Sequence, residues 1–192
     1  MAKWWITSGI LSIILLSTAA WVQFNEQSAS DRFKQEFLYR INKARAAGCS
    51  CGKQYMPPAP PLTWNANLEA AAIAHAQDMN NRNYFSHTSK DGRTSEDRIV
   101  AAGYSMIGYR SLAVGENIAF GQTSIAEVSD GWFKSEGHCH NLMSREFKEI
   151  GVAHVGQYWT QEFGGRETFT PEQQKMLKEG RGRLIIRKES TE

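Results

Sequence analysis

Two short segments contain residue types that bind metals or act as nucleophiles. In "SEGHCHN", residues 135–141, His138 and His140 flank Cys139. The segment "GCSCG", residues 48–52, holds the other two cysteines. Thiolates and imidazoles are good zinc ligands, two cysteines can form a disulfide, and a cysteine with a base beside it can be a nucleophile. These residues are compatible with each chemistry and with an ordinary core, so the compartment of the chain is the first thing to establish.

The beginning of the chain predicts export. One charge, Lys3, precedes an uncharged apolar run from Trp4 to Phe24, which has tryptophans at both ends. Such a run is typical of a cleaved signal peptide or of an uncleaved anchor, because about 20 apolar residues span a bilayer and tryptophan favours its interfaces. We expect residues 1–30 to be a signal peptide or signal anchor, with the anchor favoured. Exported cysteines tend to pair, and of three cysteines one is left over.

Composition limits the remaining possibilities. The 192 residues suffice for one domain with a substantial core, and the net charge of +2 implies no strongly charged partner. No dense basic stripe with interleaved aromatic residues is present, so we expect no nucleic-acid partner. The composition shifts after Gly165, so we expect a main domain over residues 31–164 and a helical extension over residues 165–192.

Periodicity predicts helices followed by a small sheet. Apolar residues at helical spacing predict helices over residues 31–47, 65–83, 94–104 and 124–135, and residues 46–62, rich in glycine and proline, read as a loop. "GVAHV" and "YWTQEF" alternate and predict an antiparallel hairpin. "TPEQQKMLKEG" has the start signals of another helix. Helices with a small antiparallel sheet predict an α+β sandwich.

Seven motifs follow one another along the chain: "WNANLEAAAIAHAQDM", "YFSH", "DGRTSEDRIVAAGY", "VGENIAFG", "GWFKSEGHCHNLM", "EIGVAHV" and "YWTQEFG". In this order they resemble the CAP superfamily, which comprises cysteine-rich secretory, antigen 5 and pathogenesis-related 1 proteins. The similarity is to its exported bacterial SCP-like branch and covers residues 33–164. It implies a three-layer α-β-α sandwich with a central cleft, to which the sequence adds the apolar N-terminal helix.

The resemblance also implies a set of cleft residues. The histidine of "FSH" is His87, the glutamate of "GEN" is Glu116, and the histidine after glycine in the tryptophan segment is His138. Two imidazoles with a nearby carboxylate fit Zn²⁺, so these three residues are the expected metal ligands. Many eukaryotic members carry a second glutamate three residues after the tryptophan, where this chain has Ser135. Glu136 follows it, and Glu116 and Glu136 are the two candidates for a catalytic base.

Exported bacterial relatives resemble this chain in having one cysteine in the early loop and one in the "GHC" segment. The resemblance therefore implies a disulfide between Cys51 and Cys139, with a Cys49–Cys139 pair as the alternative. Cys49 is then free or pairs with another molecule. The remaining histidines read as structural: His75 on the apolar stripe of its helix, and His140 turned away from the cleft.

The function that follows is that of an exported or anchored domain of the bacterial envelope, located in the periplasm, at the cell surface or in the medium. We expect it to bind a lipid, a cell-envelope component or a protein, and to contact a membrane through residues 4–24 if they are retained. The alternative is a metal-dependent hydrolase acting on peptides through the same cleft. The chain lacks "HExxH" and any strong nucleophile–base signature, which favours binding over catalysis.

Overall fold

A four-stranded sheet is the central layer of the structure, which is a computed structural model describing residues 30–181. The strand order is β3-β5-β6-β4, with β3 parallel to β5 and the other two pairings antiparallel. The strands span Thr63–Trp64 (β3), Ser111–Phe120 (β4), Glu149–Val155 (β5) and Tyr158–Glu167 (β6). The hairpin predicted from alternation is confirmed as β5–β6, and Gly156 makes its turn with φ of +62°.

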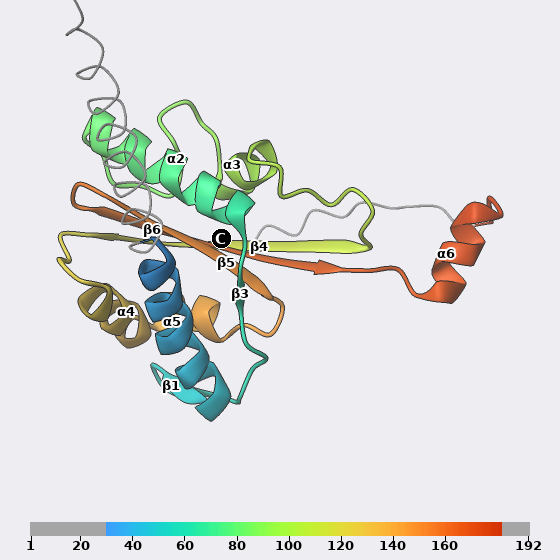
Figure 1. Ribbon diagram of the computed structural model, residues 1–192, viewed down its shortest axis with the longest axis horizontal. Helices are drawn as coiled ribbons and strands as arrows, with labels where there is room; N and C mark the ends of the chain where they lie inside the picture. The colour runs from blue at the N-terminus through green and yellow to red at the C-terminus, as the bar shows by residue number, and fades with distance from the viewer. Residues whose placement is uncertain (1–29, 182–192) are drawn as a thin grey trace, which may run out of the picture.

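Helices cover both faces of this sheet (Figure 1). On one face lie α2 (Ala66–Arg82) and α3 (Ser95–Ala101). On the other face lie the helix of residues 30–47, α4 (Ile125–Lys134) and α5 (Glu136–Met143). The predicted three-layer α-β-α sandwich is therefore the observed fold.

Each face of the sheet has its own apolar core. The core under α4 and α5 is aromatic and includes Phe37, Trp132, Trp159 and Phe163. The core under α2 uses smaller residues, among them Ala72 and Ala76. Because β6 lies between β5 and β4 with helices above and below, residues 158–165 are all buried.

Side-chain hydrogen bonds cap the first turns of three helices, α3, α4 and α6 (Pro171–Lys178), close to the starts that the sequence predicted. Thr94 and Asp97 form a reciprocal capping box at α3, and Thr170 and Gln173 do so at α6. At α4, Ser124 accepts the backbone N–H of Glu127, but that glutamate's carboxylate accepts from Thr123 instead. The helix α6 buries no residue and lies beyond the end of β6 in Figure 1.

The structure of residues 46–62 differs from the prediction. They contain a small hairpin of β1 (Cys49–Cys51) and β2 (Gln54–Met56), where the sequence predicted only loop. Gly52, with φ of +58°, permits the tight turn, and a disulfide attaches β1 to α5. The strand β4 was also not predicted.

The apolar run of residues 4–24 and the proposed boundary near residue 30 lie outside the part of the chain that the structure describes. Within residues 30–181, no helix is long and apolar enough to cross a bilayer.

Candidate functional site

Glu116 lies at the centre of the candidate site. It sits on β4 with its side chain almost fully buried, and each carboxylate oxygen has a partner. His87 Nδ1 donates to Oε1 at 2.7 Å, and Arg98 Nη2 donates to Oε2 at 2.6 Å. Burial opposes ionisation, but the His87 hydrogen bond and the Arg98 charge outweigh it and hold the pKa of Glu116 below its usual value. The carboxylate is therefore ionised and fixed in place.

Arg98 connects this carboxylate to the loop that carries His87. Its side chain is 2% exposed and lies on α3, and its Nη1 donates to the backbone oxygens of His87 and Arg93 and to Ser89 Oγ, at 3.0–3.1 Å. The loop between α2 and α3 is thus held by one guanidinium. The sequence contains Arg98 within "TSEDRIV", but nothing in its spacing indicated that it is buried.

Glu162 is a second buried acid that the sequence did not reveal. It pairs with Glu116 across β4 and β6, is fully buried, and lies 3.9 Å from Arg98 Nη2. Within residues 30–181, neither of its carboxylate oxygens has a hydrogen-bond partner. Burial, and then the Glu116 charge, raise the pKa of Glu162 well above its usual value. The two acidic side chains therefore lie beside one guanidinium, with Glu116 as the carboxylate and Glu162 held as the neutral carboxylic acid.

His138 approaches from the other side of the sheet. It lies on α5, whose position is fixed by an amide network: Asn117 donates to the His138 carbonyl, and Asn141 donates to Asn117 Oδ1 and to the Glu116 carbonyl. Burial, and then the His87 charge, lower the pKa of His138, which favours the neutral imidazole. The structure thus pairs His87 directly with Glu116, and it fixes the start of α5, which carries His138, against β4 at Glu116 and Asn117.

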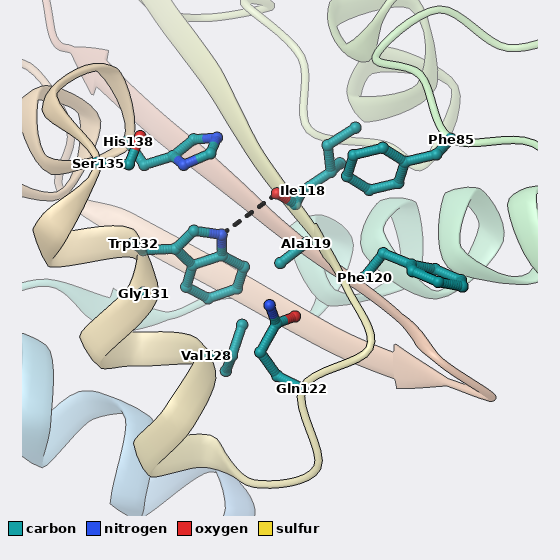
Figure 2. Close-up of a pocket in the computed structure, with 10 residues that line it drawn as sticks. All are labelled: Phe85, Ile118, Ala119, Phe120, Gln122, Val128, Gly131, Trp132, Ser135 and His138. Carbon is teal, nitrogen blue, oxygen red and sulfur yellow. Dashed lines mark hydrogen bonds between the residues drawn. The ribbon is translucent and has the colours of Figure 1, made fainter.

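A cavity of about 330 Å³ opens beside His138. Figure 2 shows Trp132 and His138 facing β4 across this cavity, with Phe85 and Phe120 at its other side. Both phenylalanines are about half exposed, at 51% and 49%. The full lining is Phe85, Ile118, Ala119, Phe120, Gln122, Val128, Gly131, Trp132, Ser135 and His138. The cavity is therefore mostly apolar, with a few polar groups including the imidazole at its edge.

The second candidate base, Glu136, points elsewhere. A Cβ built on Gly52 would clash with Glu136 Oε2, so this carboxylate lies over the turn between β1 and β2. The residue before it, Ser135, lines the cavity. Ser135 has extended backbone between α4 and α5, whereas Glu136 is the first residue of α5, so their side chains point in different directions and Glu136 does not take the place of a glutamate at position 135.

The cysteines pair as the resemblance implied. Cys51 and Cys139 form a disulfide with a Cα–Cα distance of 5.4 Å, and Cys49 is free. Among the described residues, the three sulfurs form the one group of three potential metal-ligand atoms lying within 4.8 Å of one another. Since two of them are joined to each other, this group is no thiolate site in the oxidised protein. His87, Glu116 and His138 do not form such a compact group.

The other histidines have structural roles. His75 is fully buried, its Nε2 donates to the Ser86 carbonyl at 2.9 Å, and burial lowers its pKa. His154 stacks on Trp159, with ring centroids 3.8 Å apart. His140 is half-buried and does not line the cavity.

Comparison with known proteins identifies the family of this chain. The family model of CAP, the cysteine-rich secretory protein family, matches residues 38–163. The uncharacterized protein YkwD of Bacillus subtilis is 40% identical over 108 residues, which are 55% of this chain and 40% of that protein. The uncharacterized membrane protein YlbC of the same species is 32% identical over 102 residues, 53% of this chain and 28% of that protein. The chain thus matches less than half the length of either relative.

Two solved structures share the fold. An extracellular protein containing an SCP domain from Bacillus anthracis is 31% identical with a TM-score of 0.57, over 68% of this chain and 39% of that one. An outer surface protein from Borrelia burgdorferi is 19% identical with a TM-score of 0.55, over 72% of this chain and 92% of that one. The second likeness supports the fold alone.

Proposed function

The chain belongs to CAP, the cysteine-rich secretory protein family, and from this we infer that it is the ligand-binding module of an extracytoplasmic bacterial protein. The names of two relatives support this location, since one is an extracellular protein and one a membrane protein. In this proposal residues 31–164 form the binding domain and residues 165–192 extend it. Residues 4–24 supply the export signal or the anchor.

The ligand is amphipathic, such as a fatty acid or another lipid of the envelope. The observation that carries this proposal is the apolar cavity, whose volume suits part of an acyl chain. The half-exposed Phe85 and Phe120 would be covered by the ligand, which gives their exposure a function. The imidazole of His138 lies where a polar head group could accept or donate a hydrogen bond.

The geometry supports binding better than hydrolysis. A general base must reach a water in the cavity, but Glu116 is paired with His87 and Arg98, and Glu136 lies against Gly52. Neither of the two candidate bases, Glu116 and Glu136, is therefore placed to activate a water in the cavity.

In this proposal a zinc ion is bound by two histidines, with a carboxylate behind one of them. Glu116 accepts from His87 Nδ1, which leaves Nε2 free, and this carboxylate–histidine pair is common behind zinc ligands. His87 and His138 would hold the ion, and Glu116 would orient His87 rather than bind the metal. A bound Zn²⁺ would supply a positive charge and Lewis acidity for an anionic ligand group.

Filling the cavity is expected to abolish lipid binding. Gly131 lines the cavity on α4, and a Cβ built there meets no atom within 4 Å. Gly131→Leu should therefore occupy the cavity without a clash and, because glycine is a poor helix former, without loss of stability. We expect the affinity for palmitate, measured by equilibrium dialysis, to fall by about tenfold or more, equivalent to about 1.4 kcal/mol.

Gly137→Leu is the matched control. Gly137 is also a helical glycine whose added Cβ would meet no atom within 4 Å, but it lies on α5 outside the cavity lining. Palmitate binding should be unchanged in this variant. Equal losses in the two variants, or binding that survives Gly131→Leu, would show that the lipid is not bound in this cavity.

Zinc binding is tested separately. Calorimetry with ZnCl₂ should show one site in the parent protein, lost in both His87→Ala and His138→Ala. His154→Ala is the control, since this exposed imidazole lies on β5 and does not line the cavity. A site that survives either cleft substitution would refute the two-histidine assignment while leaving lipid binding in the cavity untouched.

A further inference from the structure

The three cysteines form a cluster that neither lipid nor zinc binding uses. Cys49 and Cys51 are alternate residues of β1, so their side chains project from the same face of the strand toward α5. The Cys49 sulfur lies 3.9 Å from the Cys139 sulfur, which is already bonded to Cys51. A free thiol is thus held beside a disulfide.

We propose that Cys49 is a thiol–disulfide exchange site. Its thiolate attacks the Cys139 sulfur, the new Cys49–Cys139 bond forms, and the Cys51–Cys139 bond breaks with both of its electrons leaving on Cys51 as a thiolate. One disulfide and one thiol are present before and after the step, so no oxidant or reductant is consumed.

Loop closure does not oppose this exchange. The two alternative bonds join residues separated by 88 and 90 positions, so they restrict the unfolded chain almost equally. The balance between them is therefore decided by local packing around β1. That packing favours Cys51, which is fully buried, whereas Cys49 is partly exposed.

The local structure permits the movement that the step needs. All three sulfurs lie within 4.8 Å of one another, so the Cys49 thiol lies beside the S–S bond rather than along its axis. In-line attack then requires rotation of the Cys49 side chain. The strand that carries it pairs only with β2, over three residue pairs, and a two-stranded hairpin of this size is not rigid by itself.

Exchange changes which thiol the protein presents. In the structure the free thiol is the half-buried Cys49, and burial raises its pKa, so it is mostly protonated and slow to react near neutral pH. After exchange the free thiol is Cys51, deeper in the cluster. The cluster can therefore present its free thiol at the partly exposed Cys49 or withdraw it to the buried Cys51.

The test locates the free thiol by mass spectrometry. The full chain is incubated at neutral and alkaline pH, and free thiols are trapped with N-ethylmaleimide in acidic denaturant. The disulfide is then reduced and its cysteines are alkylated with iodoacetamide, and trypsin releases residues 46–53, between Arg45 and Lys53, which carry both Cys49 and Cys51. Fragment ions show which of the two is labelled.

We expect the label on Cys49 at first and a growing share on Cys51, at a rate that rises about tenfold per pH unit below the pKa of the thiol. The Cys49→Ser variant should take up no label, which excludes reduction as its source. The Cys51→Ser variant should oxidise to a Cys49–Cys139 bond with no free thiol. Label confined to Cys49 at alkaline equilibrium would overturn the proposal. This measurement uses the parent protein, so it tests the proposal even if Cys51→Ser fails to fold.

Discussion

Replacing Cys139 with serine is expected to lower the free energy of unfolding by about 3–5 kcal/mol. This residue is the partner common to the observed disulfide and to the exchanged one, so its loss removes both. The bond closes a loop between residues separated by 88 positions, and in the chain-entropy model a loop of this length restricts the unfolded chain strongly. Equilibrium urea unfolding without reductant measures the change.

The other two cysteines are the controls for this prediction. Cys49→Ser should change the free energy of unfolding by less than about 1 kcal/mol, because it leaves the observed disulfide intact. Cys51→Ser should cost less than Cys139→Ser, because Cys49 lies within reach of Cys139. If Cys139→Ser unfolds at the same urea concentration as the parent, the disulfide contributes little and the packing of α5 alone holds this part of the domain.

The sequence predicted the fold well because most of its elements have strong local signals. The helices of residues 30–47 and 66–82 show apolar residues at helical spacing, and Thr94 with Asp97 marks the start of α3. The hairpin of Cys49–Met56 lacks such a signal, since its strands have three residues each and its position depends on a disulfide to a distant helix. Only tertiary contacts stabilise it.

The candidate site shows where sequence patterns stop being informative. His87, Glu116 and His138 were predicted through their motifs, and the structure joins His87 Nδ1 to Glu116 Oε1, while a metal site shared by all three stays a prediction. Glu162 was missed because polar residues that alternate along a strand usually face solvent, whereas β6 is covered on both faces. The burial of Glu162 and Arg98 depends on which strands are neighbours, and strand order is not a local property of the sequence.

Arg98→Met is expected to destabilise the protein by about 3–5 kcal/mol, because removing one partner of a buried ion pair leaves the other charge uncompensated. Methionine preserves much of the side-chain volume, so the loss reports mainly on charge and hydrogen bonds. The variant leaves Glu116 buried beside Glu162 without a guanidinium. It also removes a donor from the backbone oxygens of His87 and Arg93, the second of which still accepts the Ser89 N–H. Chemical unfolding at neutral pH measures this loss.

The pH dependence of stability distinguishes the effect of the Arg98 charge from the effect of its packing. In the parent, the pKa of Glu116 is held below 4.5, so its contribution to stability is present above that pH and declines as the pH falls. In Arg98→Met the pKa of Glu116 rises above its unfolded value, so the folded variant gains stability as the pH falls. The difference in the free energy of unfolding between the parent and Arg98→Met should therefore be largest at neutral pH and shrink in acid.

Two further variants test this explanation of the Arg98→Met result. Arg93→Met removes an exposed ion pair with Asp91 and should cost less than about 1 kcal/mol. Adding Glu116→Gln to Arg98→Met removes the uncompensated carboxylate and should recover part of the lost stability. A deficit that is the same at every pH and is not reduced by Glu116→Gln would mean that Arg98 acts through its contacts with the loop rather than through its charge. In that case the loop that carries His87, and not the buried acid pair, would determine the stability of this side of the sandwich.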